Sequence, residues 1–467
     1  MTAPLRGRLA SAAICGIVGA LGGAFGSQAS HFIGSGPIVG AVAGAAFGAS
    51  FGGRSSGVGA GLMWGVAYGL GVWLAFQGAY AVVHGTAAEA MLATARSSFP
   101  ALVGDVVALG VPLGLASAIL GGRTAPGARL SVARGLVGGA AAGIVGGYAF
   151  GKWMEHANFF PLVAGLVSSS STTVGIALHF AIAITIGATF GLLFQREVRG
   201  LGSSLCFGAA YGALWWFVGP LTILPLLTHH AVDWSGAHAA TLFGSFVGHV
   251  VYGLLVGVTY AAVDRLWRRL FYESDPLNRE AVHGSLDGVA SLYRGTLASV
   301  AGGLAFSAVM LATGTLPRVA ALVGGGSVAL GFVVHMAISA IIGATYGVLF
   351  RYEAPGVAAS LAWGLAYGAI WWFLGPLTLF PILLGGTFAW TAADATLQAP
   401  SLVGHLIYGA FTALVFLALE RRHEAWRASN PRYAEHVARR RRARGTAAPA
   451  VWFFFVGLAV ALPLLFS

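Results

Sequence analysis

Charged side chains are scarce in this chain of 467 residues: Asp, Glu, Lys and Arg together make up 9%, whereas 57% of the residues are hydrophobic. A soluble protein carries about 25% charged residues, so this composition excludes a water-exposed globular protein. Several uncharged stretches reach the roughly 20 residues that an α-helix needs to cross a bilayer. The sequence therefore predicts an all-α, polytopic integral membrane protein whose main surroundings are the lipid bilayer.

Cysteine and lysine are nearly absent. The two cysteines, Cys15 and Cys206, lie in apolar stretches, and they offer neither a disulfide framework nor a zinc motif. Lys152 is the only lysine, so arginine supplies nearly all of the formal charge of +11. No nucleic-acid-binding motif accompanies this charge. Walker and HExxH motifs are also missing, and we find no basis for hydrolytic chemistry, which favours a non-enzymatic function.

Thirteen apolar stretches are candidates for membrane-spanning helices. The first of them resembles a signal peptide, but we expect an uncleaved helix because later parts of the chain begin in the same way. The thirteen stretches lie near residues 9–26, 37–53, 57–80, 98–121, 132–150, 171–194, 200–226, 240–263, 295–313, 327–350, 356–385, 399–419 and 450–466.

Basic residues are distributed very unevenly between the loops. If the N-terminus lies inside, the inner segments hold 23 of the 26 basic residues, and the outer loops hold only Arg96, Lys152 and Arg318. By the positive-inside rule, we expect a bacterial inner-membrane protein with a cytoplasmic N-terminus and an external C-terminus. Glu197 and Glu353 would lie at inner helix ends, where we expect solvated charges.

One stretch of the chain, residues 179–265, is repeated at 335–421. The segments HFAIAITIGATFGLLF, GAAYGALWWFVGPLTILP and FVGHVVYG return as HMAISAIIGATYGVLF, GLAYGAIWWFLGPLTLFP and LVGHLIYG. The offset is 156 throughout, so two histidines in each copy are duplicated with their surroundings. Any function has to account for these histidines.

A weaker third copy precedes these two. The GAAFG segment at 44–48 matches GATFG at 187–191, but the two histidine positions become Gly36 and Asp105. Because each copy has four helices, we expect parallel repeats related by an axis along the membrane normal. The predicted organisation is a degenerate four-helix repeat at 1–125, a repeat with a histidine pair at 126–270, a cytoplasmic interfacial segment at 271–293, a second repeat with a histidine pair at 294–422, a basic cytoplasmic segment at 423–449 and a C-terminal helix at 450–467.

The basic segment at 423–449 contains a run of arginines from Arg439 to Arg444. A basic cluster beside a membrane is attracted to anionic lipid by about 1 kcal/mol per residue near the surface. We therefore expect anionic lipid to bind here, although a signal that only fixes the orientation of the last helix is the simpler interpretation.

The duplicated histidines are the candidate functional residues. His179 and His249 lie about eight and nine residues from the outer ends of their helices, and His335 and His405 nearly repeat these positions. At 1.5 Å per residue, each pair lies at one level roughly 12 Å below the outer helix ends. Since imidazole is a common metal ligand, each pair has the arrangement of a bis-histidine ligand for the iron of haem b. Electron transfer is the function that this arrangement predicts.

Two other interpretations account for the same histidines. A neutral histidine can hydrogen-bond a backbone carbonyl or a neighbouring helix, a contact worth about 0.6–2 kcal/mol in membranes. The pairs would then be internal contacts of a scaffold subunit in a larger membrane complex. Ionisable residues within a bilayer also mark pathways for protons or small solutes in channels and transporters. The sequence leaves these three functions open.

The repeated GPLT segments predict a cavity near the histidines. Proline lacks a backbone donor and disfavours helical geometry before it, so we expect the helices to break near Pro220 and Pro376. Interrupted helices are tolerated in a membrane where they face protein or a water-filled cavity. Besides the histidines, the candidate binding residues are Tyr211, Trp216, Tyr252, Trp372 and Tyr408.

Each histidine-bearing repeat resembles the uncharacterised YagU-like proteins of the bacterial inner membrane. The proteins of this family are small, with about four helices, so the resemblance implies a location in the inner membrane. It implies no particular activity. The residues that carry it are His179, Gly248, His249, Tyr252 and Gly253 in one repeat and His335, Gly404, His405, Tyr408 and Gly409 in the other.

Overall fold

All regular structure in the described part of the chain is helical, which confirms the predicted all-α fold. A helix satisfies its backbone hydrogen bonds internally, which is required of apolar segments in lipid. Twelve of the described helices are long and apolar enough to cross a membrane. The computed structural model describes residues 3–30, 36–52, 57–85, 87–121, 132–198, 200–271, 286–351, 353, 356–429 and 447–467.

The predicted count of thirteen spans is not confirmed. The stretch predicted at 37–53 forms helix α2, Pro37–Phe51, which has 15 residues. At 1.5 Å per residue this helix is about 22 Å long, shorter than the roughly 30 Å hydrocarbon core. Pro37 stands in its first turn, where the missing proline donor costs nothing because that amide has no helical partner.

The chain divides into two compact units. Unit 1 comprises residues 1–198, 207–260 and 453–467, and unit 2 comprises residues 199–206 and 261–452. Three helices have residues in both units, namely α10 (Leu201–Val218), α13 (Phe243–Phe271) and α22 (Ala448–Leu465).

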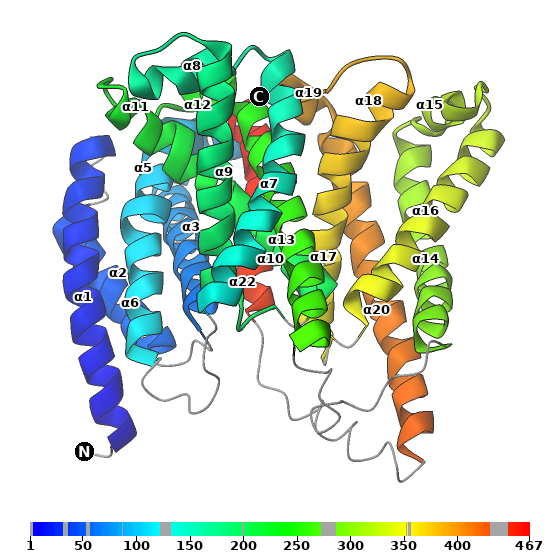
Figure 1. The fold of residues 1–467 in the computed structure, drawn as a ribbon, viewed down its shortest axis with the longest axis horizontal. Helices are drawn as coiled ribbons and strands as arrows, with labels where there is room; N and C mark the ends of the chain where they lie inside the picture. The colour runs from blue at the N-terminus through cyan, green and yellow to red at the C-terminus, as the bar shows by residue number, and fades with distance from the viewer. Residues whose placement is uncertain are drawn as a thin grey trace. The chain divides into compact units, whose positions relative to one another are not determined.

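In unit 1, the short helices α8, α11 and α12 lie at one end of the long helices α7 and α9 (Figure 1). The two chain termini lie at opposite ends of this unit (Figure 1). Its remaining elements are α1 (Ala3–Ser30), α2, α3 (Val58–His84), α4 (Ala88–Ser97), α5 (Phe99–Gly104), η2 (Asp105–Gly110), α6 (Val111–Gly121), α7 (Val132–His156), α8 (Phe160–Ala164), η4 (Gly165–Val167), α9 (Thr172–Phe194), η5 (Gly219–Ile223), α11 (Leu224–Leu227) and α12 (Gly236–Thr241).

In unit 2, the short helices α15, α18 and α19 likewise lie at one end of the long helices (Figure 1). Helix α14 packs against both α16 and α20, and α17 packs against α20. The elements are α14 (Leu286–Ala312), α15 (Leu316–Ala320), η7 (Ala321–Val323), α16 (Val328–Phe350), α17 (Val357–Leu374), η8 (Gly375–Leu379), α18 (Phe380–Leu383), α19 (Ala392–Leu397) and α20 (Ala399–Ala428).

Glycines bring neighbouring helices into backbone contact. A Cβ atom on Gly139 of α7 would collide with the backbone of Gly187 on α9, and Gly295 of α14 meets Gly343 of α16 in the same way. Without a hydrophobic force between helices in lipid, close van der Waals packing of small residues provides much of the association energy. These glycines therefore hold the histidine-bearing helices α9 and α16 against α7 and α14.

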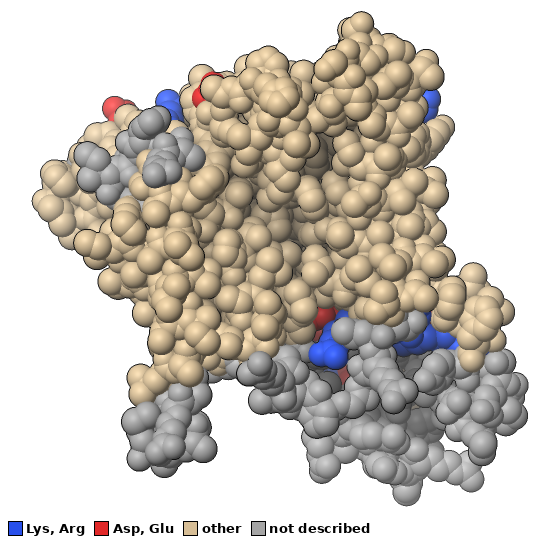
Figure 2. All heavy atoms as spheres, turned by 60° about the vertical axis from the view of Figure 1, so that its left-hand side comes forward, with Lys and Arg blue, Asp and Glu red and all other residues tan. Residues whose placement is uncertain are grey.

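The face drawn in Figure 2 is free of Lys, Arg, Asp and Glu across its middle, and its described charged side chains lie only near two ends. A broad uncharged band of this kind suits contact with the hydrocarbon core. Most of the interfacial segment at 271–293, and the arginines from Arg439 to Arg444, lie outside the described residues.

Glu197 and Glu353 are buried, with 6% and 7% of their surface exposed, so the expectation of solvated charges is wrong for both. Glu353 accepts hydrogen bonds from the backbone amides of Gly202 at 3.1 Å and Ser203 at 2.5 Å. Glu197 accepts one from the amide of Ala60 at 3.3 Å. These amides begin helices α10 and α3, where unpaired N–H groups and the helix dipole favour a negative charge. The sequence does not reveal these contacts, because each glutamate lies far along the chain from the helix whose amides it binds.

Glu353 should make the stability of the protein depend on pH. Burial raises the pKa of its carboxyl from about 4.5 to about 7, so between these values the folded chain binds more protons than the unfolded chain. The free energy of unfolding should therefore fall as the pH rises from 5 to 8, by on the order of 2–3 kcal/mol. Glu353→Gln should flatten this profile in denaturation curves of the detergent-solubilised protein.

A matched control is Glu155→Gln, because Glu155 is an exposed carboxylate paired with Lys152 at 3.0 Å. This control variant should keep the pH profile of the wild type. Identical profiles for wild type and Glu353→Gln would show that Glu353 does not hold its proton in the folded state.

Candidate functional site

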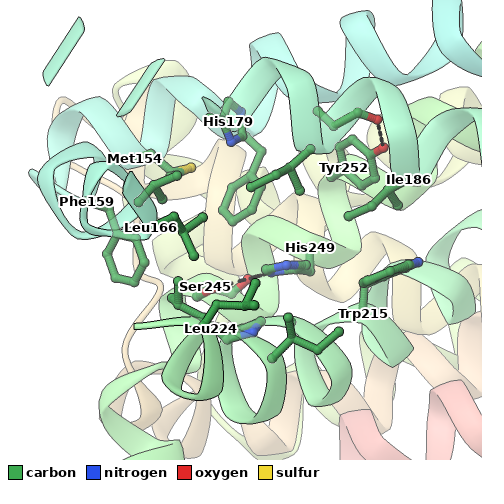
Figure 3. Close-up of a pocket in the computed structure, with 18 residues that line it drawn as sticks. Met154, Phe159, Leu166, His179, Ile186, Trp215, Leu224, Ser245, His249 and Tyr252 are labelled. Carbon is green, nitrogen blue, oxygen red and sulfur yellow. Dashed lines mark hydrogen bonds between the residues drawn. The ribbon is translucent and has the colours of Figure 1, made fainter. Parts of the chain in front are cut away.

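A cavity of about 260 Å³ lies in unit 1 among α7, α9, η5, α11 and α13. Both histidines of the first repeat line this cavity, here called the first cavity, and most of the other lining residues are apolar. Figure 3 shows His179 and His249 on different helices, with Trp215 and Leu224 on the side of η5 and α11. The structure thus places the two predicted histidines at one internal site.

A second cavity, of about 280 Å³, lies within unit 2 among the corresponding elements. Each of the eighteen positions that line the first cavity recurs 156 positions later in the lining of the second. Only four of these positions differ in residue type. They pair Phe159 with Thr315, Ala183 with Ser339, Ile223 with Leu379 and Leu224 with Phe380.

His249 presents a hydrogen-bond acceptor beside the interrupted helix. Its Nδ1 lies 2.7 Å from the carbonyl oxygen of Ser245 on its own helix, and because a carbonyl only accepts, Nδ1 carries the hydrogen. In the neutral ring, Nε2 is then left with a lone pair. A Cβ on Gly219 of η5 would lie 4.0 Å from this Nε2, so the acceptor faces the π-helical turn.

His405 repeats this arrangement in the second cavity. Its Nδ1 donates to the carbonyl oxygen of Ser401 at 2.8 Å. A Cβ on Gly375 of η8 would lie 3.7 Å from its Nε2. The same ring nitrogen is therefore presented to the same turn in both cavities.

His179 and His335 bond to a neighbouring helix instead. The Nε2 of His179 donates to the carbonyl oxygen of Gly147 on α7 at 2.9 Å, and that of His335 donates to Gly303 on α14 at 3.2 Å. Both rings are 6% exposed. These contacts match the interhelical bond that the scaffold interpretation predicts, so the first histidine of each pair contributes to packing.

A phenylalanine that the sequence analysis missed lies close to both histidines. The ring centre of Phe150 is 5.8 Å from that of His179 and 4.8 Å from that of His249. Phe306 lies 5.0 and 4.7 Å from His335 and His405. The glycine before each second histidine makes room for this ring, since a Cβ on Gly248 would collide with Phe150. That glycine was the available signal.

The donor set does not fit haem held between the two imidazoles. Axial ligation brings a nitrogen of each ring to within about 2 Å of the metal, as for other histidine-bound metals. Here Phe150 makes edge contacts with both rings, and the Nε2 of His179 is already bonded to the carbonyl oxygen of Gly147. Among the described residues, no group of three or more His, Cys, Asp or Glu is placed to hold a metal ion.

The predicted aromatic residues divide between the cavities and the surrounding core. Tyr252 and Tyr408 line the cavities, and their hydroxyls donate to the carbonyls of Ala183 at 2.6 Å and Ser339 at 2.8 Å. The others are Tyr211, bonded to Thr189 at 2.7 Å, Trp216, which donates to Leu242 at 3.0 Å, and Trp372, which donates to Gln398 at 2.9 Å.

Of each tandem tryptophan pair, the first member faces the cavity. Trp215 and Trp371 line the two cavities, whereas Trp216 and Trp372 are fully buried and line neither. The sequence could not separate the members of a pair, because both tryptophans stand in an apolar helix whose inward face is set by its packing against distant helices.

The GPLT segments form π-helical turns rather than breaks. The hydroxyl of Thr222 donates to the carbonyl of Phe217 at 2.7 Å, which satisfies an acceptor that the wider turn leaves free. Trp234 in turn donates to the Thr222 hydroxyl at 3.2 Å. The equivalent bonds of Thr378 and Trp390 measure 2.7 and 2.9 Å. Each turn therefore lines a cavity while the carbonyl before it, that of Phe217 or Phe373, is hydrogen-bonded.

A much smaller space lies at the corresponding position in the N-terminal part of unit 1. Asp105, at the position of the second histidine, borders a pocket of only about 10 Å³, close to the minimum for one water molecule. Gly26 and Gly104 approach each other there, with 3.6 Å between the Cα of one and a Cβ placed on the other.

Comparisons of this chain with protein-family models, with curated proteins and with solved structures found no match. The function has to be inferred from the residues around the two cavities.

Gly248→Ala should destabilise the protein by about 1–3 kcal/mol, because the added methyl group overpacks against Phe150. In the Phe150→Ala background, the same change should cost much less, which a double-mutant cycle of unfolding free energies measures. Gly78→Ala is the control, since a Cβ there meets nothing within 4 Å. Additive costs for the two substitutions would contradict the contact.

Proposed function

We propose that this chain is an integral membrane protein that binds a small, mainly apolar molecule carrying one hydrogen-bond donor in each of two cavities. The observation that supports this most directly is the Nε2 lone pair of His249 and of His405, presented beside an apolar cavity by a bond from Nδ1 to a backbone carbonyl.

The size and lining of the cavities suit such a molecule. An apolar cavity of about 150 Å³ holds benzene, so 260–280 Å³ leaves space for roughly twice that volume. Aliphatic and aromatic side chains supply the contacts, and the imidazole supplies an acceptor for a hydroxyl or amine. A site built to hydrogen-bond a polar group discriminates strongly against analogues that lack it, because its own polar group is then left unpaired.

Movement of the bound molecule through the membrane is the second proposal, in line with a channel or transporter. The feature that favours it is the π-helical turn beside each cavity, since interrupted membrane helices commonly form the substrate sites of transporters. Loss of solute flux in liposomes on replacement of His249 and His405 would support transport. A scaffold subunit, the third proposal, would instead retain a stable membrane partner through purification.

We further propose the topology that the sequence suggested: three four-helix repeats and a last helix, with the N-terminus in the cytoplasm. Residues 156 positions apart line both cavities, which supports a repeated unit. Termini at opposite ends of unit 1 (Figure 1) support an odd number of crossings. Twelve long helices with α2 as a shorter thirteenth meet this condition. The resemblance to YagU-like inner-membrane proteins stays a proposal of the same kind.

Binding should depend on the second histidine of each pair. In nanodiscs, an eight-carbon alcohol with a photo-crosslinking group should label peptides of both cavities. His249→Leu should reduce labelling of the first cavity by roughly tenfold, the range expected when one hydrogen bond is lost and its partner is left unpaired, and His405→Leu should do the same in the second.

His84→Leu is the control for this experiment. His84 bonds the carbonyl of Tyr80 four residues earlier at 2.9 Å, as His249 does with Ser245, but His84 is exposed and lines neither cavity. It should not change the labelling. Equal labelling by the corresponding alkane probe would contradict recognition of a donor.

The haem prediction is tested by the absorption spectrum of the purified protein. Because Phe150 and Phe306 contact both imidazoles of their cavities, we expect no Soret band and no split bands on reduction. A Soret band that disappears in a variant lacking His249 and His405 would revive electron transfer as the function.

A further inference from the structure

The two cavities differ in polarity on one side. Five polar residues in the lining of the second cavity have an apolar residue 156 positions earlier in the sequence, and one of the five is cationic. Of the apolar partners, Phe159 and Ala183 line the first cavity. The pairs are Leu162 and Arg318, Leu242 and Gln398, Ala157 and Thr313, Phe159 and Thr315, and Ala183 and Ser339.

Arg318 is held beside an aromatic ring that the first cavity lacks. Its guanidinium carbon lies 5.5 Å from the ring centre of Phe380, and Leu224 stands at the equivalent position of the first cavity. A guanidinium over an aromatic face is stabilised by the ring quadrupole. The arginine and the phenylalanine therefore occur together in the one cavity and are both missing from the other.

The charge of Arg318 is available to a ligand. No Asp or Glu lines the second cavity among the described residues, and no described carboxylate is placed to form an ion pair with Arg318. The side chain is exposed, so it need not lose its hydration when the cavity is empty. Arg318 is thus a cation at the border of an apolar cavity, with threonine hydroxyls beside it.

We infer that the second cavity takes an apolar molecule that carries a carboxylate end in addition to its hydrogen-bond donor, whereas the first cavity takes a neutral one. The inference rests on the proposed function, and it assigns a charge class to each of the two sites. The planar guanidinium of Arg318 matches the two oxygens of a carboxylate. No Lys or Arg lines the first cavity among the described residues, so a carboxylate there would lack a cationic partner.

A reciprocal exchange tests this inference on the full chain in nanodiscs of zwitterionic lipid. Two photo-crosslinking probes are used, both of them eight-carbon alcohols, and labelled peptides are quantified by mass spectrometry. The carboxylate probe carries a carboxylate at the end opposite the hydroxyl, and the hydroxyl probe carries a methyl group there. Arg318→Leu removes the cation from the lining of the second cavity. Leu162→Arg introduces an arginine at the equivalent position of the first repeat. Lys152→Leu is the control, because it removes one positive charge at a residue that lines neither cavity.

In the wild type, the hydroxyl probe should label both cavities and the carboxylate probe mainly the second. Arg318→Leu should lower carboxylate labelling of the second cavity by roughly tenfold and change hydroxyl labelling less than about twofold. Leu162→Arg should bring carboxylate labelling to the first cavity. High salt should weaken the carboxylate preference, because the arginine is exposed and its charge is screened.

Three outcomes are informative, and they distinguish failure of the charge assignment from failure of the proposed function. Carboxylate labelling that is unchanged in Arg318→Leu, together with hydroxyl labelling of both cavities, would overturn the charge assignment and leave the proposed function intact. Failure of both probes to label either cavity in the wild type would overturn the proposed function and the inference together. Equal loss of both probes in Arg318→Leu would show a structural role for the arginine and would also overturn the assignment.

Discussion

Satisfaction of backbone hydrogen bonds in an apolar medium is the constraint on which this structure depends. Helices meet it along most of their length, and the exceptions are met by specific side chains. Thr222 and Thr378 satisfy carbonyls at the two π-helical turns. Glu197 and Glu353 satisfy amides at the starts of two helices. The histidines belong to the same set, since each donates to a backbone carbonyl. The cavities therefore lie where the helix pattern is interrupted but remains satisfied.

The sequence was sufficient to predict the features that depend on local composition. The uncharged stretches predicted the helices. The repeat at an offset of 156 predicted that His179 and His249 share one site and that His335 and His405 share an equivalent one. The GPLT segments located the interruptions. The features that it could not supply depend on distant contacts. Nothing near Glu353 indicates the amide of Ser203, and nothing near Phe150 indicates that its ring lies against two histidines from other helices.

The differences between the cavities show which features tolerate change. Both histidines, the tyrosine, the tryptophan and the glycine–proline step are the same in both linings. The substitutions lie elsewhere, and they change the charge and the hydrogen-bonding capacity of the border around Arg318. A common acceptor combined with a different border is the pattern expected when two sites bind molecules of similar shape but different end groups, because charge complementarity contributes specificity more than affinity.

The two histidines of a pair differ in what their hydrogen bonds can do. The bond of His179 to Gly147 joins two helices, so it contributes to the packing of α7 against α9, and such bonds average about 0.6 kcal/mol in membrane proteins. The bond of His249 to Ser245 stays within one helix, so it adds nothing to the association of helices. Its effect is to fix the hydrogen on Nδ1 and to direct Nε2 toward the π-helical turn. A buried polar ring that stabilises no helix contact through its hydrogen bond is costly in lipid, and an acceptor for a bound molecule is the role that its geometry leaves.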